Sequence, residues 1–228
     1  MLGHREGEFR DETVLTPAMA LLLVAADTIP LRQLPRAPVF DGVVEAAEYG
    51  APVARVATRG GAVPVWLGRS GDWVYVAAAL PDSTVSWRDE FAFLLDPVGD
   101  RTPAPGHDDS EWVIRRVVDS SEVLRGVHGR WQLPGDDPAW RLRAARGGEG
   151  WEVRVTSTAA GWQVELRIEA AWLSGTYGGV PGVAFRAYDE SVRVWSGWPA
   201  SAACPDGAQL ERLPPCWSAV LGEGAPGQ

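Results

Sequence analysis

The stretch from residue 63 to residue 96 constrains the fold most, because it holds three short apolar segments separated by turn residues. Residues 63–67 and 73–80 flank Gly68–Asp72, whose glycine, serine and aspartate are typical of a hairpin loop. The third segment, residues 91–95, follows a polar loop and ends at Asp96. Short apolar segments bounded by turn residues predict paired strands rather than long helices.

The remainder of the chain continues this pattern. Its 26 glycines and 18 prolines indicate many turns. Residues 151–155 and 162–168 alternate apolar and polar side chains, which predicts strands with one buried and one solvated face. We therefore predict an all-β fold, an antiparallel β-sandwich of jelly-roll or immunoglobulin-like type with short helical turns at 43–50 and 169–174. Further strands are expected at 52–58, 111–118, 139–145, 150–157, 180–188 and 192–195.

Three segments are expected along the chain: a leader at 1–26, one β-sandwich domain at 27–220 and a flexible tail at 221–228. Residues 14–26 are apolar, too few for a membrane span but long enough for the core of a secretion signal. Two acidic residues follow Arg10, where a signal normally carries positive charge, so a first strand or disordered leader is the alternative. We expect an extracytoplasmic or secreted protein with no membrane span, and its oligomeric state stays open.

Charge and motif content exclude several functions. The net charge of −9 repels phosphate backbones and anionic lipids, so no nucleic-acid partner is expected. All 21 basic residues are arginines, which excludes a lysine nucleophile or Schiff base. The three histidines are scattered, and neither a nucleophile elbow nor a phosphate-binding loop is present. We therefore predict that the chain is not an enzyme.

Five motifs in a fixed order resemble those of the family 9 carbohydrate-binding modules and the wider DOMON-like β-sandwich group. The resemblance covers about residues 36–213. Its motifs are Pro38–Gly42 with Glu45 and Glu48, Trp73–Val76 with Asp82, Trp87–Asp89 leading to Phe93–Asp96, Asp108–Trp112, and Gly161–Ile168.

The resemblance implies a non-catalytic module that holds a sugar between two tryptophans, since the apolar face of a pyranose stacks on an indole ring. Trp87 occupies the place of the first tryptophan. The second is expected near residues 202–203, where this chain has alanines, so Trp198 is the candidate partner. Asp89 and Arg115 complete the predicted ligand set, whereas the family's glutamate is replaced by Ala92. The alternative is a structural or protein-interaction module of the cell envelope that binds no sugar.

A metal site is expected in the acidic loop that follows residue 95. Asp96, Asp100, Asp108 and Asp109 place four carboxylates in a short segment, and calcium prefers such oxygen ligands. Related modules often carry structural calcium, and the alternative is a merely solvated loop. Some DOMON-like relatives bind haem through methionine, lysine or histidine, but the chain has no lysine and both methionines precede the domain, so no haem is expected.

Cys204 and Cys216 are the only cysteines. In an exported protein they are expected to form a disulfide, which would pin the loop that carries Trp198. Two buried free thiols are the alternative.

Overall fold

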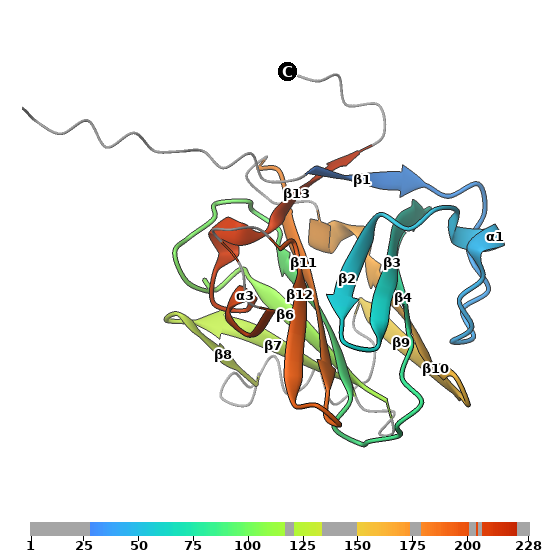
Figure 1. The fold of residues 1–228 in the computed structure, drawn as a ribbon. Helices are drawn as coiled ribbons and strands as arrows, with labels where there is room; N and C mark the ends of the chain where they lie inside the picture. Colours follow the sequence, from blue (N-terminus) through green and yellow to red (C-terminus); the bar gives the residue numbers. More distant parts are fainter. Residues whose placement is uncertain are drawn as a thin grey trace, which may run out of the picture.

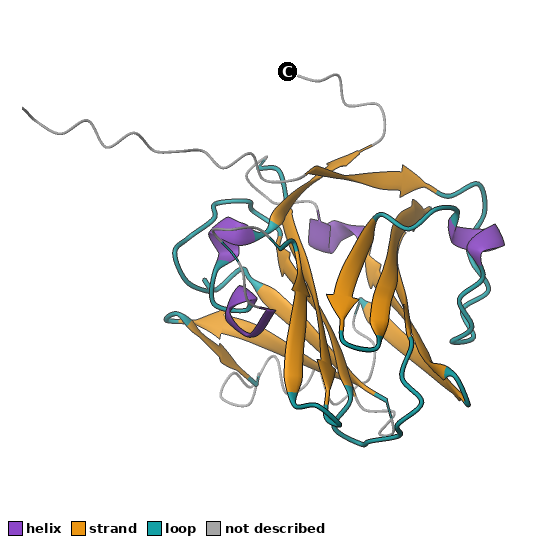
Figure 2. Ribbon diagram, viewed as in Figure 1, coloured by secondary structure: helices purple, strands orange, loops and turns teal. Residues whose placement is uncertain are grey.

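The computed structural model describes residues 28–116, 121–133, 150–173, 179–200, 204 and 207–222. These residues form two facing layers of strands (Figures 1 and 2). The first layer contains β8 (Arg130–Gln132), β7 (Ser121–Val127), β6 (Ser110–Arg115), β5 (Glu90–Asp96), β11 (Gly182–Asp189), β12 (Val194–Trp198) and β13 (Ser218–Gly222). The second contains β2 (Ala54–Thr58), β3 (Gly61–Ser70), β4 (Trp73–Leu80), β10 (Gly161–Glu169) and β9 (Trp151–Thr158).

Strand β1 (Thr28–Gln33) joins the two layers along one edge. Its first four residues pair with β13, and Arg32 and Gln33 pair with Gly68 and Arg69 of β3. Both pairings are parallel, whereas the other strand pairs are antiparallel. The all-β prediction is confirmed, but the sandwich is one curled sheet with a parallel seam rather than a wholly antiparallel pair of sheets.

The predicted hairpin is the pair β3 and β4. Its turn is tighter than the sequence indicated, because the residues from Gly68 to Ser70 pair with Tyr75 to Trp73. Only Gly71 and Asp72 remain in the loop, and Gly71 has a positive φ of 58°. A short loop with positive φ matches the twist of the two strands.

The core lies between the two layers and is built by alternation along the strands. In the first layer Phe91, Phe93 and Phe185 point inward and are completely buried. The ring of Phe93 stacks on Trp112 with a centroid separation of 5.4 Å and on Phe185 at 5.7 Å. Because successive side chains in a strand point to opposite faces, their neighbours in sequence must point outward from this layer.

The described residues also form four short helical segments: α1 (Ala46–Tyr49), α3 (Gly207–Leu210) and the 3-10 helices η1 (Ala170–Leu173) and η2 (Pro214–Cys216). The helical turns expected near 43–50 and 169–174 are α1 and η1. The segment ending in α1 lies on the outer face of the second layer, where Glu165 accepts hydrogen bonds from the Gly42 amide at 2.6 Å and from the Tyr49 hydroxyl. Glu165 thus pins this segment to β10.

Several elements differ from the sequence prediction. Strands β1, β7, β8 and β13 were not expected, and β13 includes Leu221 and Gly222, which the prediction had placed in the tail. The strand predicted at 139–145, the leader at 1–26 and the remaining tail lie outside the described residues. No helix among the described segments is long and apolar enough to cross a membrane.

Candidate functional site

The outward side of the first layer carries a row of aromatic and charged side chains, here called the outer face. Tyr188 of β11 is in register with Trp195 of β12 on one side and with Glu90 of β5 on the other. Glu90 is in turn in register with Arg115 of β6. Residues directly opposite each other in a sheet present their side chains on the same face, so these four form one continuous row.

The aromatic end of the row is a compact cluster. The rings of Trp195 and Tyr188 lie 5.0 Å apart between centroids, and both side chains are half-buried. The guanidinium carbon of Arg186 lies 3.9 Å from the centroid of the Trp195 ring, which is cation–π geometry. The cluster thus places the apolar rings of Trp195 and Tyr188 next to the charged side chain of Arg186.

Arg186 is held in place by two carboxylates. Its Nη1 lies 2.9 Å from Oε1 of Glu111 and 2.6 Å from Oε2 of Glu211. Burial raises the pKa of Glu111 to about 7, against the opposing effect of Arg186. Because Arg186 and Glu111 are almost completely buried, they support Trp195 from below rather than face solvent.

The charged end of the row is partly open to solvent. Arg115 keeps 25% of its side chain exposed and lies 2.9 Å from Glu90 and 2.8 Å from Glu122. The two ion pairs fix the position of the guanidinium, and hydrogen bonding to Glu122 and Glu90 raises the pKa of Arg115 against the effect of burial. The Arg115 guanidinium can donate hydrogen bonds to the hydroxyl groups of a ligand, and the carboxylates of Glu90 and Glu122 can accept hydrogen bonds from them.

Trp87 stands at the rim of the outer face, in the loop that leads into β5. Its side chain is 56% exposed, and the guanidinium of Arg88 lies 4.6 Å from its ring centroid. Arg88 pairs with Glu190 at 3.4 Å, and the Tyr188 hydroxyl donates to the same carboxylate at 2.7 Å. Trp87 is thereby linked through three successive contacts to Tyr188, at the aromatic end of the row.

Asp89 positions the Trp87 loop and is only 1% exposed. Its carboxylate accepts hydrogen bonds from the amides of Ser86 at 3.0 Å and Glu190 at 3.2 Å, and Nη1 of Arg116 lies 3.4 Å away. These contacts tie the loop before β5 to the turn after β11. The structure therefore gives Asp89 a supporting position, whereas the sequence had placed it in the ligand set.

Trp198 lies on the opposite side of the layer from this row. It pairs with Phe185, and the two rings are 5.7 Å apart between centroids, packed against the core. Phe185 is level with Phe93, well along β5, whereas Trp87 comes before the first residue of that strand. The structure thus does not bring Trp87 and Trp198 together across a cleft.

The acidic loop brings its carboxylates together as the sequence indicated. Oxygens of Asp96, Asp100 and Asp108 lie within 4.8 Å of one another. Asp109 is 1% exposed, and its Oδ2 accepts a hydrogen bond from the Gly106 amide at 2.7 Å, while its Oδ1 has no partner. The pKa of Asp109 is raised to about 8, chiefly by burial; the hydrogen bond from the Gly106 amide lowers it and the neighbouring aspartates contribute to the rise.

The grouped carboxylates of Asp96, Asp100 and Asp108 have the oxygen chemistry that a hard cation such as calcium prefers, and Asp109 lies outside this group. One buried oxygen each of Asp108 and Asp109 has no hydrogen-bond partner, and such atoms are costly unless they are satisfied. No arginine forms an ion pair with any of the four within the part of the chain that the structure describes. Beside the loop the rings of His107 and His128 lie 5.5 Å apart, a contact between distant residues that the sequence gave no means to predict.

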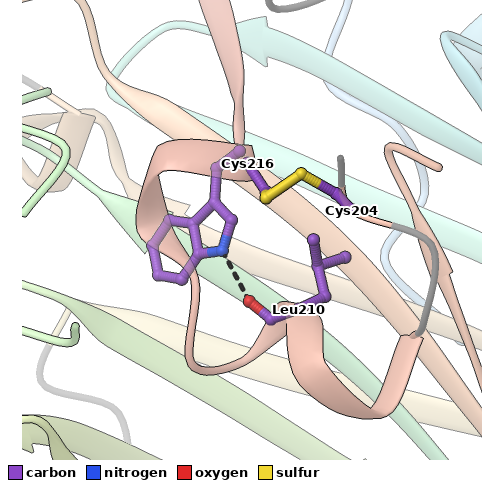
Figure 3. The surroundings of a disulfide bond; sticks show 4 residues. Cys204, Leu210 and Cys216 are labelled. Atoms are coloured by element: carbon purple, nitrogen blue, oxygen red, sulfur yellow. Dashed lines mark hydrogen bonds between the residues drawn. A yellow bond between two sulfur atoms is a disulfide. The ribbon is translucent and has the colours of Figure 1, made fainter. Parts of the chain in front are cut away.

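Cys204 and Cys216 form the predicted disulfide, with their Cα atoms 6.0 Å apart (Figure 3). The adjacent Trp217 donates from its indole nitrogen to the carbonyl of Leu210 at 2.9 Å, the bond drawn in that figure. Trp217 is completely buried and stacks on Trp131 with a centroid separation of 6.3 Å. The disulfide therefore anchors the segment between β12 and β13 against the outer side of the first layer.

Comparison with solved structures identifies the architecture. One match is a family 9 carbohydrate-binding module from Caldicellulosiruptor kristjanssonii in complex with cellotriose, at 19% identity over 88% of this chain and 95% of that one, with a TM-score of 0.59. A second is a family 9 module from the same organism in complex with glucose, at 19% identity over 89% of this chain and 98% of that one, with a TM-score of 0.55. The chain has a family 9 carbohydrate-binding module fold.

No protein-family model and no curated protein matches the sequence. The family 9 fold is nevertheless the one that the order of motifs indicated, so that prediction is confirmed. The residues that the sequence missed are Tyr188, Arg186 and Trp195, together with the partners of Arg115. The sequence could have indicated that Trp195 and Trp198 lie on opposite faces of the sheet. They are three residues apart in one strand, and residues separated by an odd number in a strand point to opposite sides.

Proposed function

We propose that the chain is a non-catalytic carbohydrate-binding module whose sugar lies on the outer face, between the rim tryptophan Trp87 and the cluster of Trp195 and Tyr188. The observation that carries this proposal is the row of aromatic and ion-paired side chains in register across four strands. The fold shared with modules that hold cellotriose or glucose supports it.

The chemistry of the row suits a pyranose. Arg88 covers one face of Trp87, so the sugar would stack its apolar face on the other side of that indole. Arg115 and its two carboxylate partners would exchange hydrogen bonds with the hydroxyl groups. Such a site disfavours ligands without hydroxyls, because its charged groups would lose solvent without gaining partners.

The proposal is tested by calorimetric titration with cellotriose and glucose. We expect Trp87→Ala and Trp195→Ala each to weaken binding at least tenfold. Trp73→Ala is the matched control, because Trp73 is also half-buried but packs on the outer side of the second layer. No heat with either sugar for the wild-type protein, or equal losses in all three variants, would refute the proposal.

A structural or protein-interaction module is the second candidate. It is favoured by the centre of the outer face, where Ala92 and Val113 lie between Arg186 and Glu122 and offer no hydrogen-bonding side chain. This candidate predicts normal folding and no response to any sugar. The two candidates are therefore separated by the same titration.

Two further features belong to this proposal. We propose that the four aspartates of the acidic loop bind calcium, which would neutralise their charge and hold the loop between β5 and β6. We also propose an extracytoplasmic location, because the disulfide between Cys204 and Cys216 persists in oxidising compartments.

A further inference from the structure

A cleft of about 480 Å³ opens at one end of the sandwich, between turns that belong to the two layers. Its walls come from the β2–β3 turn, from residues 81–84 after β4 and from the β11–β12 turn at 189–192. A deeper part shares the walls at Arg59, Asp82 and Asp189 and is floored by apolar side chains. The floor is formed by Val63, Leu80 and Trp162.

One wall of this end cleft carries an excess of negative charge. Carboxylate oxygens of Asp82, Asp89 and Asp189 lie within 4.8 Å of one another. The completely buried side chain of Arg116 lies 3.4 Å from both Asp82 and Asp89. Asp189 has no ion pair with any described residue, so one cation stands against three carboxylates.

The pKa of Asp82 is affected by this excess of negative charge. Burial raises the pKa of Asp82, and the charges of Asp89 and Asp189 raise it further, while the Thr84 amide and Arg116 lower it. A ligand that brings positive charge to this wall would be favoured for the same reason. A bare metal ion is less suited, because the buried Arg116 already stands at two of the three carboxylates.

The cleft is also lined by a cation without a partner among the described residues. Arg59 lies in the β2–β3 turn, is exposed, and lines both parts of the cleft. It forms no ion pair or hydrogen bond with the residues that the structure describes. A guanidinium binds a carboxylate through two parallel hydrogen bonds, so Arg59 suits an anionic group.

We propose that the end cleft, which borders the outer face at Tyr188, is a second ligand site for a small zwitterion such as an amino acid or short peptide. Its ammonium group would lie between Asp82 and Asp189 and its carboxylate would meet Arg59, while the deeper part of about 20 Å³ has room for about one water molecule. Convergent charged groups in a cleft are typical of a small-molecule site.

The test is a titration of the isotope-labelled protein with dialanine, followed by amide chemical shifts. We expect shifts at residues 58–60, 81–84 and 189–192, and affinities at least tenfold lower for N-acetyl-dialanine, which lacks the ammonium, and for dialanine amide, which lacks the carboxylate. Equal binding of the capped forms would overturn the proposal. So would shifts at these residues with calcium chloride alone and none with dialanine.

Two variants separate this site from the outer face. Arg59→Gln is expected to weaken dialanine binding at least tenfold, while Arg55→Gln, an exposed arginine of β2 that does not line the cleft, leaves it unchanged. Neither variant should change cellotriose binding, and Trp195→Ala should not change dialanine binding. Competition between dialanine and cellotriose, or equal loss in both arginine variants, would refute a separate zwitterion site.

Discussion

Replacing Asp109 with asparagine tests the charge balance of the acidic loop. In the metal-free protein the pKa of Asp109 is raised from 3.8 to about 8, chiefly by burial. A group whose pKa is raised on folding favours the folded state fully only below its unfolded pKa, and this contribution is lost as the pH rises through its folded pKa. The metal-free protein should therefore lose stability between about pH 4 and pH 8.

The magnitude at pH 7 follows from the same shift. Each pKa unit corresponds to about 1.36 kcal/mol, so holding a carboxyl of ordinary pKa 3.8 protonated at pH 7 costs about 4 kcal/mol of unfolding free energy. The Asp109→Asn variant avoids this cost and keeps an acceptor for the Gly106 amide. For a chain of this size we expect its melting temperature in chelator to lie roughly 10 °C above that of the wild type.

Calcium should narrow this difference without reversing it. At a hundredfold excess over its dissociation constant, calcium stabilises the wild type by about 2.7 kcal/mol, whereas the Asp109→Asn variant, with a ligand lost, should show little response. Scanning calorimetry at pH 5 and pH 7, with chelator and with calcium, measures both effects, and Asp72→Asn in an exposed turn is the control. A variant that melts below the wild type in chelator at pH 7, or that keeps the full calcium shift, would refute the reasoning.

Three other substitutions test the fold. Cys216→Ser opens a loop of sequence separation 12 and should cost about 3 kcal/mol, read as a lower melting temperature that reducing agent reproduces in the wild type. Phe185→Ala removes a completely buried ring and should cost about 3–5 kcal/mol in chemical denaturation, whereas Val39→Ala at an exposed site should cost nothing measurable. Arg116→Leu leaves the buried Asp89 without its ion pair and should cost about 3–5 kcal/mol at pH 7 in chemical denaturation, so an unchanged stability would contradict the ion-pair account.

The central strands could be predicted because their sequences carry strong local signals. The segments at 73–80 and 91–95 are apolar and bounded by turn residues, and the alternation at 162–168 shows one buried face. The short strand β8 and the C-terminal strand β13 have no such pattern, since Ser218–Gly222 mixes small and apolar residues beside a presumed tail. The parallel seam at β1 depends on pairing between residues far apart in the chain, which no local pattern encodes.

Only those features of the candidate site that have a local sequence signal could be predicted. Trp87 and Arg115 were found through motifs, and the acidic loop and the two cysteines through composition and spacing. The partners of Arg115 come from two other strands, and the role of Trp195 depends on its register with Tyr188. The burial of Asp89 could not be predicted, because a motif gives a residue's position in sequence but not whether its side chain is buried.

The position of the bound sugar on the outer face is the central feature of the proposed function. Titration of the isotope-labelled protein with cellotriose, followed by backbone amide and tryptophan indole signals, locates the ligand without any substitution. We predict shifts confined to the Trp87 loop and to the outer-face positions of β5, β6, β11 and β12, with the largest indole shifts at Trp87 and Trp195. No shifts at saturating cellotriose, or shifts centred on the outer side of the second layer around Trp73, would contradict it.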